Sequence, residues 1–197
     1  MPRLIARGAG AETRIIGSKF RQVFRLQDLV IKLFPEARIV QIVRDPRDVA
    51  MSFHAFSWKN NPEEAEKTVP TLAHSVRRVF DFWPGTVGMI RNFGGPGREH
   101  LYHEIRYEDL KADALPVMTG VAEFLGADAA PGKIQAAIDA ASFEKMSGGR
   151  EAGREDEGSF FRKGVSGDWR EKFDDDCHAA FEECADKELM REIGYID

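Results

Sequence analysis

The sequence contains little cysteine and no long hydrophobic run. Its two cysteines, Cys177 and Cys184, are seven residues apart on a predicted helix, which favours reduced thiols in or near the core over a disulfide. No apolar stretch approaches the roughly 18 residues of a membrane-spanning helix, and no signal-peptide core precedes the first predicted strand. We therefore expect a cytoplasmic protein.

An excess of positive charge is also missing. The 197 residues include 28 Lys+Arg and 33 Asp+Glu, and the net charge of −5 argues against a general nucleic-acid binder or membrane-surface binder. With 43% hydrophobic and 31% charged residues, the chain is long enough for one sizeable core. We expect residues 1–12 to be a loose lead-in and residues 13–197 to form one domain.

The most informative stretch is residues 38–53. It begins with the β-branched apolar run Ile39–Val43, which is typical of a strand buried on both faces of a parallel sheet. Asp45 and Pro46 then fit the N-cap and first position of a helix. The pattern therefore predicts an α/β fold with Arg44 at the carboxyl end of a strand, the edge at which such sheets bind ligands.

Arg44 has two possible roles at that edge. A guanidinium beside a helix N-terminus, with the hydroxyl of Ser52 on the same helix, would form a phosphate clamp. Alternatively, Arg44 is a surface residue that pairs with Asp45 or Asp48. The strand–turn–helix pattern alone leaves these two interpretations about even.

Hydrophobic periodicity and turn residues predict the other elements of the chain. They are a short strand at 13–17, a helix from Ser18 to Leu33, a loop with a helical turn at 60–69, a helix from Thr71, a strand at 100–105, helices at 113–125 and 131–146, and a closing helix at 175–193 with Gly194 as its C-cap.

Two separated motifs resemble a known family. Residues 43–52, Val-Arg-Asp-Pro-Arg-Asp-Val-Ala-Met-Ser, are similar to the signature by which sulfotransferases hold the 3′-phosphate of PAPS, 3′-phosphoadenylyl sulfate. Residues 160–170, Phe-Phe-Arg-Lys-Gly-Val-Ser-Gly-Asp-Trp-Arg, resemble the family's Arg-Lys-Gly-x-x-Gly-Asp-Trp loop, which closes over the nucleotide. Both motifs in the right order are more specific than either alone.

The resemblance implies a PAPS-dependent sulfotransferase with a three-layer α/β/α fold and a parallel sheet, similar to P-loop NTPases. It implies that PAPS is a co-substrate, that PAP is its product, that no metal is used, and that the acceptor is a small molecule with a hydroxyl or amine. We expect no nucleic-acid or membrane partner.

The resemblance also implies which residues bind the nucleotide: Arg44, Ser52, Arg162, Lys163 and Gly164 at the phosphate, and Tyr107 and Phe143 at the adenine. Adjacent cations followed by glycine let backbone amides approach a phosphate closely, although a solvated basic loop is the alternative. Tyr107 could instead be a half-buried tyrosine with a hydrogen-bonded hydroxyl, and Phe143 could belong to the core.

Two residues are candidates for catalysis. Lys19 matches the lysine of the family's Lys-Thr-His element at the acceptor site, but no histidine follows it here. His54 could supply a base that works near neutral pH, although a lone histidine near a helix end more often caps the helix or lies on the surface.

The family's Pro-Lys-Ser-Gly-Thr-Thr-Trp loop, which wraps the 5′-phosphosulfate, has no counterpart in these residues, and neither has a Walker-type motif. The resemblance begins near Ile15, so we expect an N-terminally incomplete fold that lacks the first strand–loop–helix unit and has an unpaired sheet edge. An active enzyme, a PAP-binding module with impaired catalysis and a non-functional fragment all remain open.

Overall fold

The structure is a computed structural model and describes residues 15–19, 26–142 and 166–197. Within these ranges, the sheet consists of two parallel strands, β1 (Ile39–Val43) and β2 (Tyr102–Arg106). Ile39 lies opposite Tyr102 and Val43 opposite Arg106, so the carboxyl ends of both strands meet at one edge. The residues that follow the strands, Arg44 and Tyr107, therefore start from neighbouring positions.

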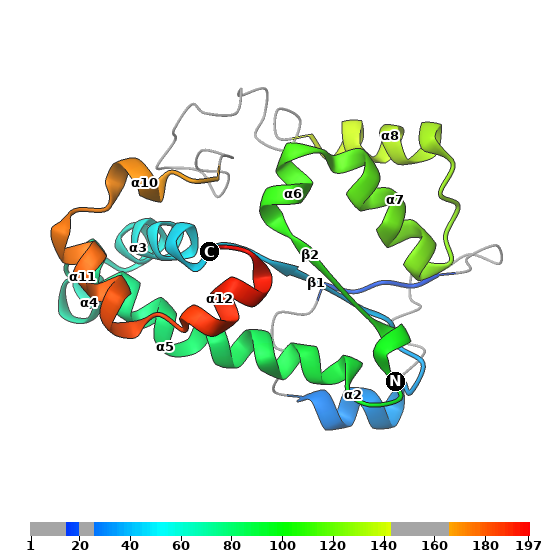
Figure 1. Cartoon of the computed structure of the whole chain (residues 1–197), viewed down its shortest axis with the longest axis horizontal. Coiled ribbons are helices and arrows are strands. Elements are labelled where there is room, and N and C mark those ends of the chain that lie inside the picture. Colours follow the sequence, from blue (N-terminus) through cyan, green and yellow to red (C-terminus); the bar gives the residue numbers. More distant parts are fainter. Residues whose placement is uncertain (1–14, 20–25, 143–165) are drawn as a thin grey trace.

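Helices cover the two strands (Figure 1). The crossover from β1 to β2 consists of α3 (Pro46–Asn60), α4 (Pro62–Thr68) and α5 (Leu72–Arg91), followed by the short helices η2 (Asn92–Gly94) and η3 (Glu99–Leu101). In Figure 1, α6 (Tyr107–Ala112), α7 (Ala114–Leu125) and α8 (Pro131–Ala140) lie to one side of the strands, away from α3 and α5. The other helices are α2 (Gln27–Leu33), α10 (Trp169–Lys172), α11 (Asp175–Cys184) and α12 (Lys187–Ile193). The predicted α/β class with a parallel sheet is confirmed.

The core is centred on α5. Its buried side chains pack against α3, α11 and the chain end, and Phe80 meets the ring of Phe181 edge to face, with 5.6 Å between the ring centroids. Buried members of this core include Val43, Ala50, Met51, Val76, Val79, Phe80, Trp83, Val87, Cys177, Phe181, Met190 and Ile193. The core therefore joins the β1–α3 unit to the last helices of the chain.

Local signals place the main helix starts correctly. The side chain of Asp45 accepts a hydrogen bond from the Arg47 amide at 2.9 Å, and Pro46 is the first residue of α3, as the sequence predicts. Thr71 caps α5 by accepting from the amide of His74. Gly194 ends α12 with a φ of 84°, a left-handed conformation that favours glycine.

Three predicted elements differ from the structure. Residues 15–17 do not form a strand, because no described segment pairs with their backbone. Ser18 and Lys19 are not helical, residues 20–25 lie outside the described ranges, and the last part of the predicted helix is α2. The predicted closing helix is two helices, because Ala185 is extended and the carboxylate of Asp186 caps a new helix by accepting from the Leu189 amide at 3.0 Å.

Other predictions are shorter in the structure or fall outside it. The helix predicted for 131–146 ends at Ala140, and residues 143–146 lie outside the described ranges, as do residues 1–12. The outer edge of β1 has no strand partner among the described residues, and the side chain of Ile42 on this strand is 56% exposed. In the part of the chain that the structure describes, no helix is both long and apolar enough to cross a membrane.

The core makes a first prediction. Phe80→Ala should lower the free energy of unfolding by about 3–5 kcal/mol, because it removes a buried ring and leaves a cavity beside Phe181. Phe56→Ala is the matched control, since Phe56 is 54% exposed, and should change stability by less than about 0.5 kcal/mol. Urea unfolding of both variants measures the difference, and equal losses would contradict this description of the core.

Candidate functional site

The end of β1 brings three of the predicted nucleotide-binding residues together. The Arg44 guanidinium donates from Nη1 to the Ser52 hydroxyl at 3.3 Å, and its central carbon lies 4.8 Å from the centre of the Tyr107 ring. These residues come from the β1–α3 turn, from α3 and from the start of α6. The indole of Trp83 donates to the carbonyl of Arg44 at 3.2 Å and so fixes the backbone at this point.

The same geometry shows which of the two carboxylates, Asp45 or Asp48, lies beside Arg44. Asp45 turns away to pair with Arg47, whereas a carboxylate oxygen of Asp48 lies 3.9 Å from Nη2 of Arg44. Arg44 thus contacts both Ser52 and Asp48. Its side chain is 26% exposed, so the guanidinium is held by the protein and is still within reach of solvent.

A buried ion pair fixes the turn that follows Arg44. The Arg47 guanidinium donates to both carboxylate oxygens of Asp45, at 2.9 and 2.8 Å, and each residue is only 5% exposed. Arg47 also donates to the carbonyl of Tyr195 at 2.7 Å and lies 3.7 Å from the centre of the Trp169 ring. Charged side chains as buried as these are costly unless several partners satisfy them.

Asp48 connects the turn to the second sequence motif. Its two carboxylate oxygens accept from the backbone amides of Gly167, at 2.6 Å, and Trp169, at 3.3 Å. Gly167 has a φ of 86°, a left-handed conformation that favours glycine. The Gly-Asp-Trp motif is thus held against α3, more than a hundred residues away in sequence.

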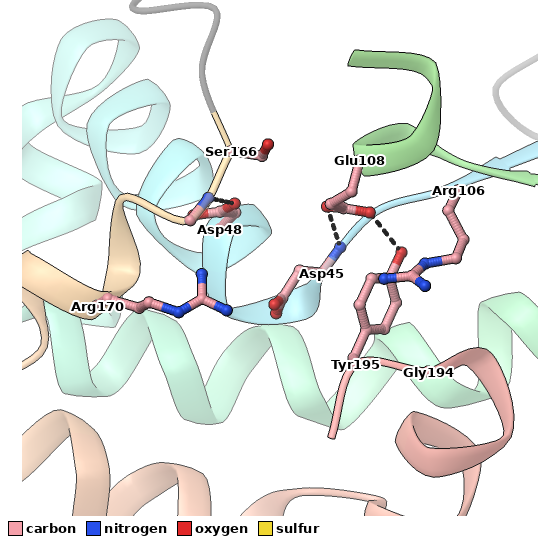
Figure 2. Close-up of a pocket in the computed structure, with 9 residues that line it drawn as sticks. Asp45, Asp48, Arg106, Glu108, Ser166, Arg170, Gly194 and Tyr195 are labelled. Atoms are coloured by element: carbon pink, nitrogen blue, oxygen red, sulfur yellow. Dashed lines mark hydrogen bonds between the residues drawn. The ribbon is translucent and has the colours of Figure 1, made fainter. Parts of the chain in front are cut away.

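A cavity of about 140 Å³ lies beside this turn (Figure 2). Glu108 bridges one side of it, accepting from the Asp45 amide at 3.1 Å and from the Tyr195 hydroxyl at 3.0 Å. Burial, and then the charge of Glu108, raise the pKa of Tyr195, so its hydroxyl stays protonated as a donor. The cavity is lined by Asp45, Asp48, Arg106, Glu108, Ser166, Gly167, Arg170, Gly194 and Tyr195.

The catalytic candidates lie in different settings. Lys19 is exposed in a segment without regular structure. His54 faces α5, because its Nδ1 is 2.9 Å from the hydroxyl of Ser75, which is completely buried. Burial lowers the pKa of His54 below its ordinary value. The hydroxyl of Ser75 is too deep to be reached by a substrate, so the pair is not a nucleophilic dyad.

Other predicted residues lie outside the described ranges, and some residues of the site were not predicted from the sequence. Phe143, Arg162, Lys163 and Gly164 lie outside the described residues. The sequence interpretation missed Arg47, Glu108 and Tyr195, whose partners are far along the chain. Glu108 directly follows Tyr107, which the family resemblance places at the adenine, and this was the one local signal available. Among the described residues, no group of three His, Cys, Asp or Glu side chains is arranged to hold a metal.

The chain is similar in sequence to known proteins. Residues 24–194 match the family model described as sulfotransferase domain. Flavonol 3-sulfotransferase of Flaveria bidentis is 27% identical over 172 residues, which are 77% of this chain and 54% of that protein. Human sulfotransferase 2A1 is 27% identical over 165 residues, 74% of this chain and 56% of that protein. Amine sulfotransferase of Oryctolagus cuniculus is 28% identical over 149 residues, 68% and 48% of the two chains.

A solved structure shows the same fold. Mouse sulfotransferase SULT7A1, crystallised with PAP, superimposes with a TM-score of 0.65 and 24% identity, covering 87% of this chain and 65% of that chain. The chain spans about half the length of the curated relatives it matches.

The ion pair at the turn makes a second prediction. Asp45→Ala should lower the free energy of unfolding by about 3–5 kcal/mol, because it leaves Arg47 charged, buried and without its carboxylate. Glu183→Ala removes the partner of Arg77 in an exposed pair and should cost less than about 1 kcal/mol. Denaturant unfolding of both variants measures the two losses in the free energy of unfolding. Similar losses would contradict the prediction that the buried pair contributes more to stability than the exposed pair.

His54 makes a prediction about pH. Its pKa in the folded protein lies below the ordinary value of 6.5, so the unfolded chain binds the proton more readily. The stability that neutral His54 contributes is present above pH 6.5 and is lost as the pH falls through the folded pKa. His54→Gln should therefore lose less stability than the wild-type protein between pH 7.5 and pH 5, as measured by urea unfolding at each pH. Parallel pH profiles of the two proteins would contradict the assignment of His54 as a partly buried, neutral side chain.

Proposed function

The chain belongs to the sulfotransferase domain family, and on that premise we propose that it binds PAPS and PAP at the carboxyl edge of β1 and β2. The protein would transfer the sulfuryl group of PAPS to a hydroxyl or amine of a small-molecule acceptor. The observation that carries the proposal is the convergence of Arg44, Ser52 and Tyr107, from three elements, at the edge where α/β sheets bind ligands.

Arg44 is the main phosphate ligand in this proposal. Its guanidinium lies over the Tyr107 ring and is bonded to Ser52, so part of its conformational freedom is already lost before a ligand arrives. A guanidinium presents paired N–H donors that match the oxygens of a phosphate. The Ser52 hydroxyl would add one further donor, and we propose that Tyr107 contacts the adenine.

The proposal assigns the other nucleotide contacts to residues outside the described ranges. Arg162, Lys163 and Gly164 would bind the 3′-phosphate together with Arg44 and Ser52, and Phe143 would lie beside the adenine. Their support is the sequence motif, together with the position of Gly167 and Trp169, which belong to the same motif and whose amides donate to Asp48.

The transfer itself is an in-line displacement. A bond forms between the acceptor oxygen or nitrogen and sulfur while the bond from sulfur to the phosphate oxygen of PAPS breaks, and PAP leaves with that electron pair. The acceptor proton passes to a base, for which we propose His54, and Lys19 would stabilise negative charge. Since Nδ1 of His54 is engaged with Ser75, proton transfer would use Nε2.

A second candidate function is PAP binding without turnover. Its support is that the contacts at the strand edge join Arg44, Ser52 and Tyr107, which are all proposed nucleotide ligands, whereas the proposed base His54 is bonded to Ser75. An assay of sulfuryl transfer from PAPS to acceptor alcohols, phenols and amines, with PAP as the co-product, separates the two functions, because the binding module would show PAP affinity and no turnover.

The proposed acceptor class stays broad. The names of relatives refer to flavonols, amines and steroids, and for this chain we propose only a small molecule with a hydroxyl or amine.

We propose the cytoplasm as the location of the protein, because Cys177 and Cys184 are both free thiols, as is usual in a reducing compartment. Burial raises the pKa of Cys177 to about 11, so this thiol stays protonated at neutral pH.

Nucleotide binding makes the central prediction. PAP at about a hundred times its dissociation constant should stabilise the wild-type protein by roughly 2.7 kcal/mol, seen as a higher melting temperature. Arg44→Ala should melt cooperatively and lose this shift, because it removes the charge that faces the phosphate. Arg78→Ala is the matched control, since Arg78 is an exposed arginine on α5, and should keep the full shift.

Three outcomes are informative. A shift that only Arg44→Ala loses supports the site. A cooperative melt with no shift in the wild-type protein contradicts both the enzyme and the binding module. No cooperative melt of the wild-type protein points to a chain that does not fold stably alone.

A further inference from the structure

Asp48 is the most deeply buried charge beside the proposed phosphate site. Its side chain is 1% exposed, and a carboxylate at this depth is costly unless its oxygens are satisfied. Its partners belong to two segments: the guanidinium of Arg44 at 3.9 Å, and the backbone amides of Gly167 and Trp169 at 2.6 and 3.3 Å. Asp48 is thus the point at which these two segments meet.

Asp48 does not act as the cap of its own helix. Asp45 is the N-cap of α3, and Asp48, one turn later, uses its two oxygens for amides that lie more than a hundred residues away. Its place in the first turn of α3 lies near the positive end of the helix dipole. The negative charge is therefore fixed between an arginine side chain and the Gly167–Trp169 backbone.

The contacts of Arg44 show what this charge does. Ser52 bonds one terminal nitrogen, Asp48 lies beside the other, and the Tyr107 ring covers the guanidinium. These restraints come from different directions and leave the side chain partly exposed. A ligand then meets an arginine that is already oriented, which lowers the ordering cost of binding.

We propose that Asp48 is a positioning residue for recognition of the 3′-phosphate, acting through Arg44 and through the backbone of Gly167 and Trp169. This inference rests on the proposed nucleotide site and adds the residue that organises it. Asp48 itself carries the same charge sign as the phosphate and does not contact the ligand. Its effect should therefore depend on whether the nucleotide has a 3′-phosphate.

The test compares PAP with AMP, which has the same adenosine and 5′-phosphate but lacks the 3′-phosphate. Asp48→Asn keeps the size of the side chain and one acceptor oxygen but removes the charge. Isothermal titration should show PAP affinity lowered by about tenfold or more, as for a lost charge-assisted contact, and AMP affinity changed less than about twofold. Asp174→Asn, which alters another carboxylate that accepts a backbone amide, should change neither affinity.

A second measurement needs no variant and covers the case in which Asp48→Asn fails to fold. If Asp48 couples the phosphate to the Gly167 and Trp169 amides, binding must reciprocally stabilise those bonds. Hydrogen exchange of the wild-type protein should show both amides better protected with saturating PAP than with saturating AMP.

The outcomes separate this inference from the function on which it rests. Selective loss of PAP affinity, or selective protection by PAP, supports the positioning role. Equal losses for PAP and AMP, an unchanged PAP affinity in Asp48→Asn, or equal protection by both nucleotides would overturn it and leave nucleotide binding intact. Wild-type protein that binds no PAP overturns the proposed function and this inference together.

Discussion

The buried ion pair between Asp45 and Arg47 is the constraint on which the rest of the site depends. It closes the turn between β1 and α3, and Arg47 then extends the contact to the carbonyl of Tyr195 and the ring of Trp169. Buried ion pairs add little net stability compared with apolar packing, but they penalise every arrangement that breaks them. Here the pair determines where the end of the chain and the Gly-Asp-Trp motif lie relative to the strand edge.

The residues of the short segment 44–48 have different roles. Arg44 is partly exposed and would face the proposed ligand, Asp45 and Arg47 are buried and hold the turn, and Asp48 accepts hydrogen bonds from a distant segment. A strand that runs directly into a helix allows this division, because successive side chains leave the turn in different directions. The same segment thereby supplies both the charge that we propose binds the ligand and the support that orients it.

Local chemistry explains which parts of the structure could be predicted. The β-branched run at Ile39–Val43, the Asp45–Pro46 helix start and the arginine between them are set by neighbouring residues, so the sequence alone places Arg44 at a strand edge. The division of the last helix depended on one side chain, Asp186, whose cap competes with helix continuation. The predicted strand near Ile15 needed a partner strand, and local pattern cannot show whether one is present.

The long-range contacts could not be read from the sequence. Asp48 was considered only as a partner of Arg44, because the amides of Gly167 and Trp169 are donors that every residue but proline carries and that no motif marks. The link from Glu108 to Tyr195 likewise joins two segments that the fold alone brings together. The family resemblance predicted roles for Arg44 and Ser52, and the structure shows their contact with each other.

A crystal structure of the protein with PAP would test the central claim most directly. The account predicts 3′-phosphate oxygens within about 3.2 Å of the Arg44 guanidinium and the Ser52 hydroxyl, with the adenine near Tyr107. PAP bound elsewhere, or bound with its 3′-phosphate away from Arg44, would contradict it.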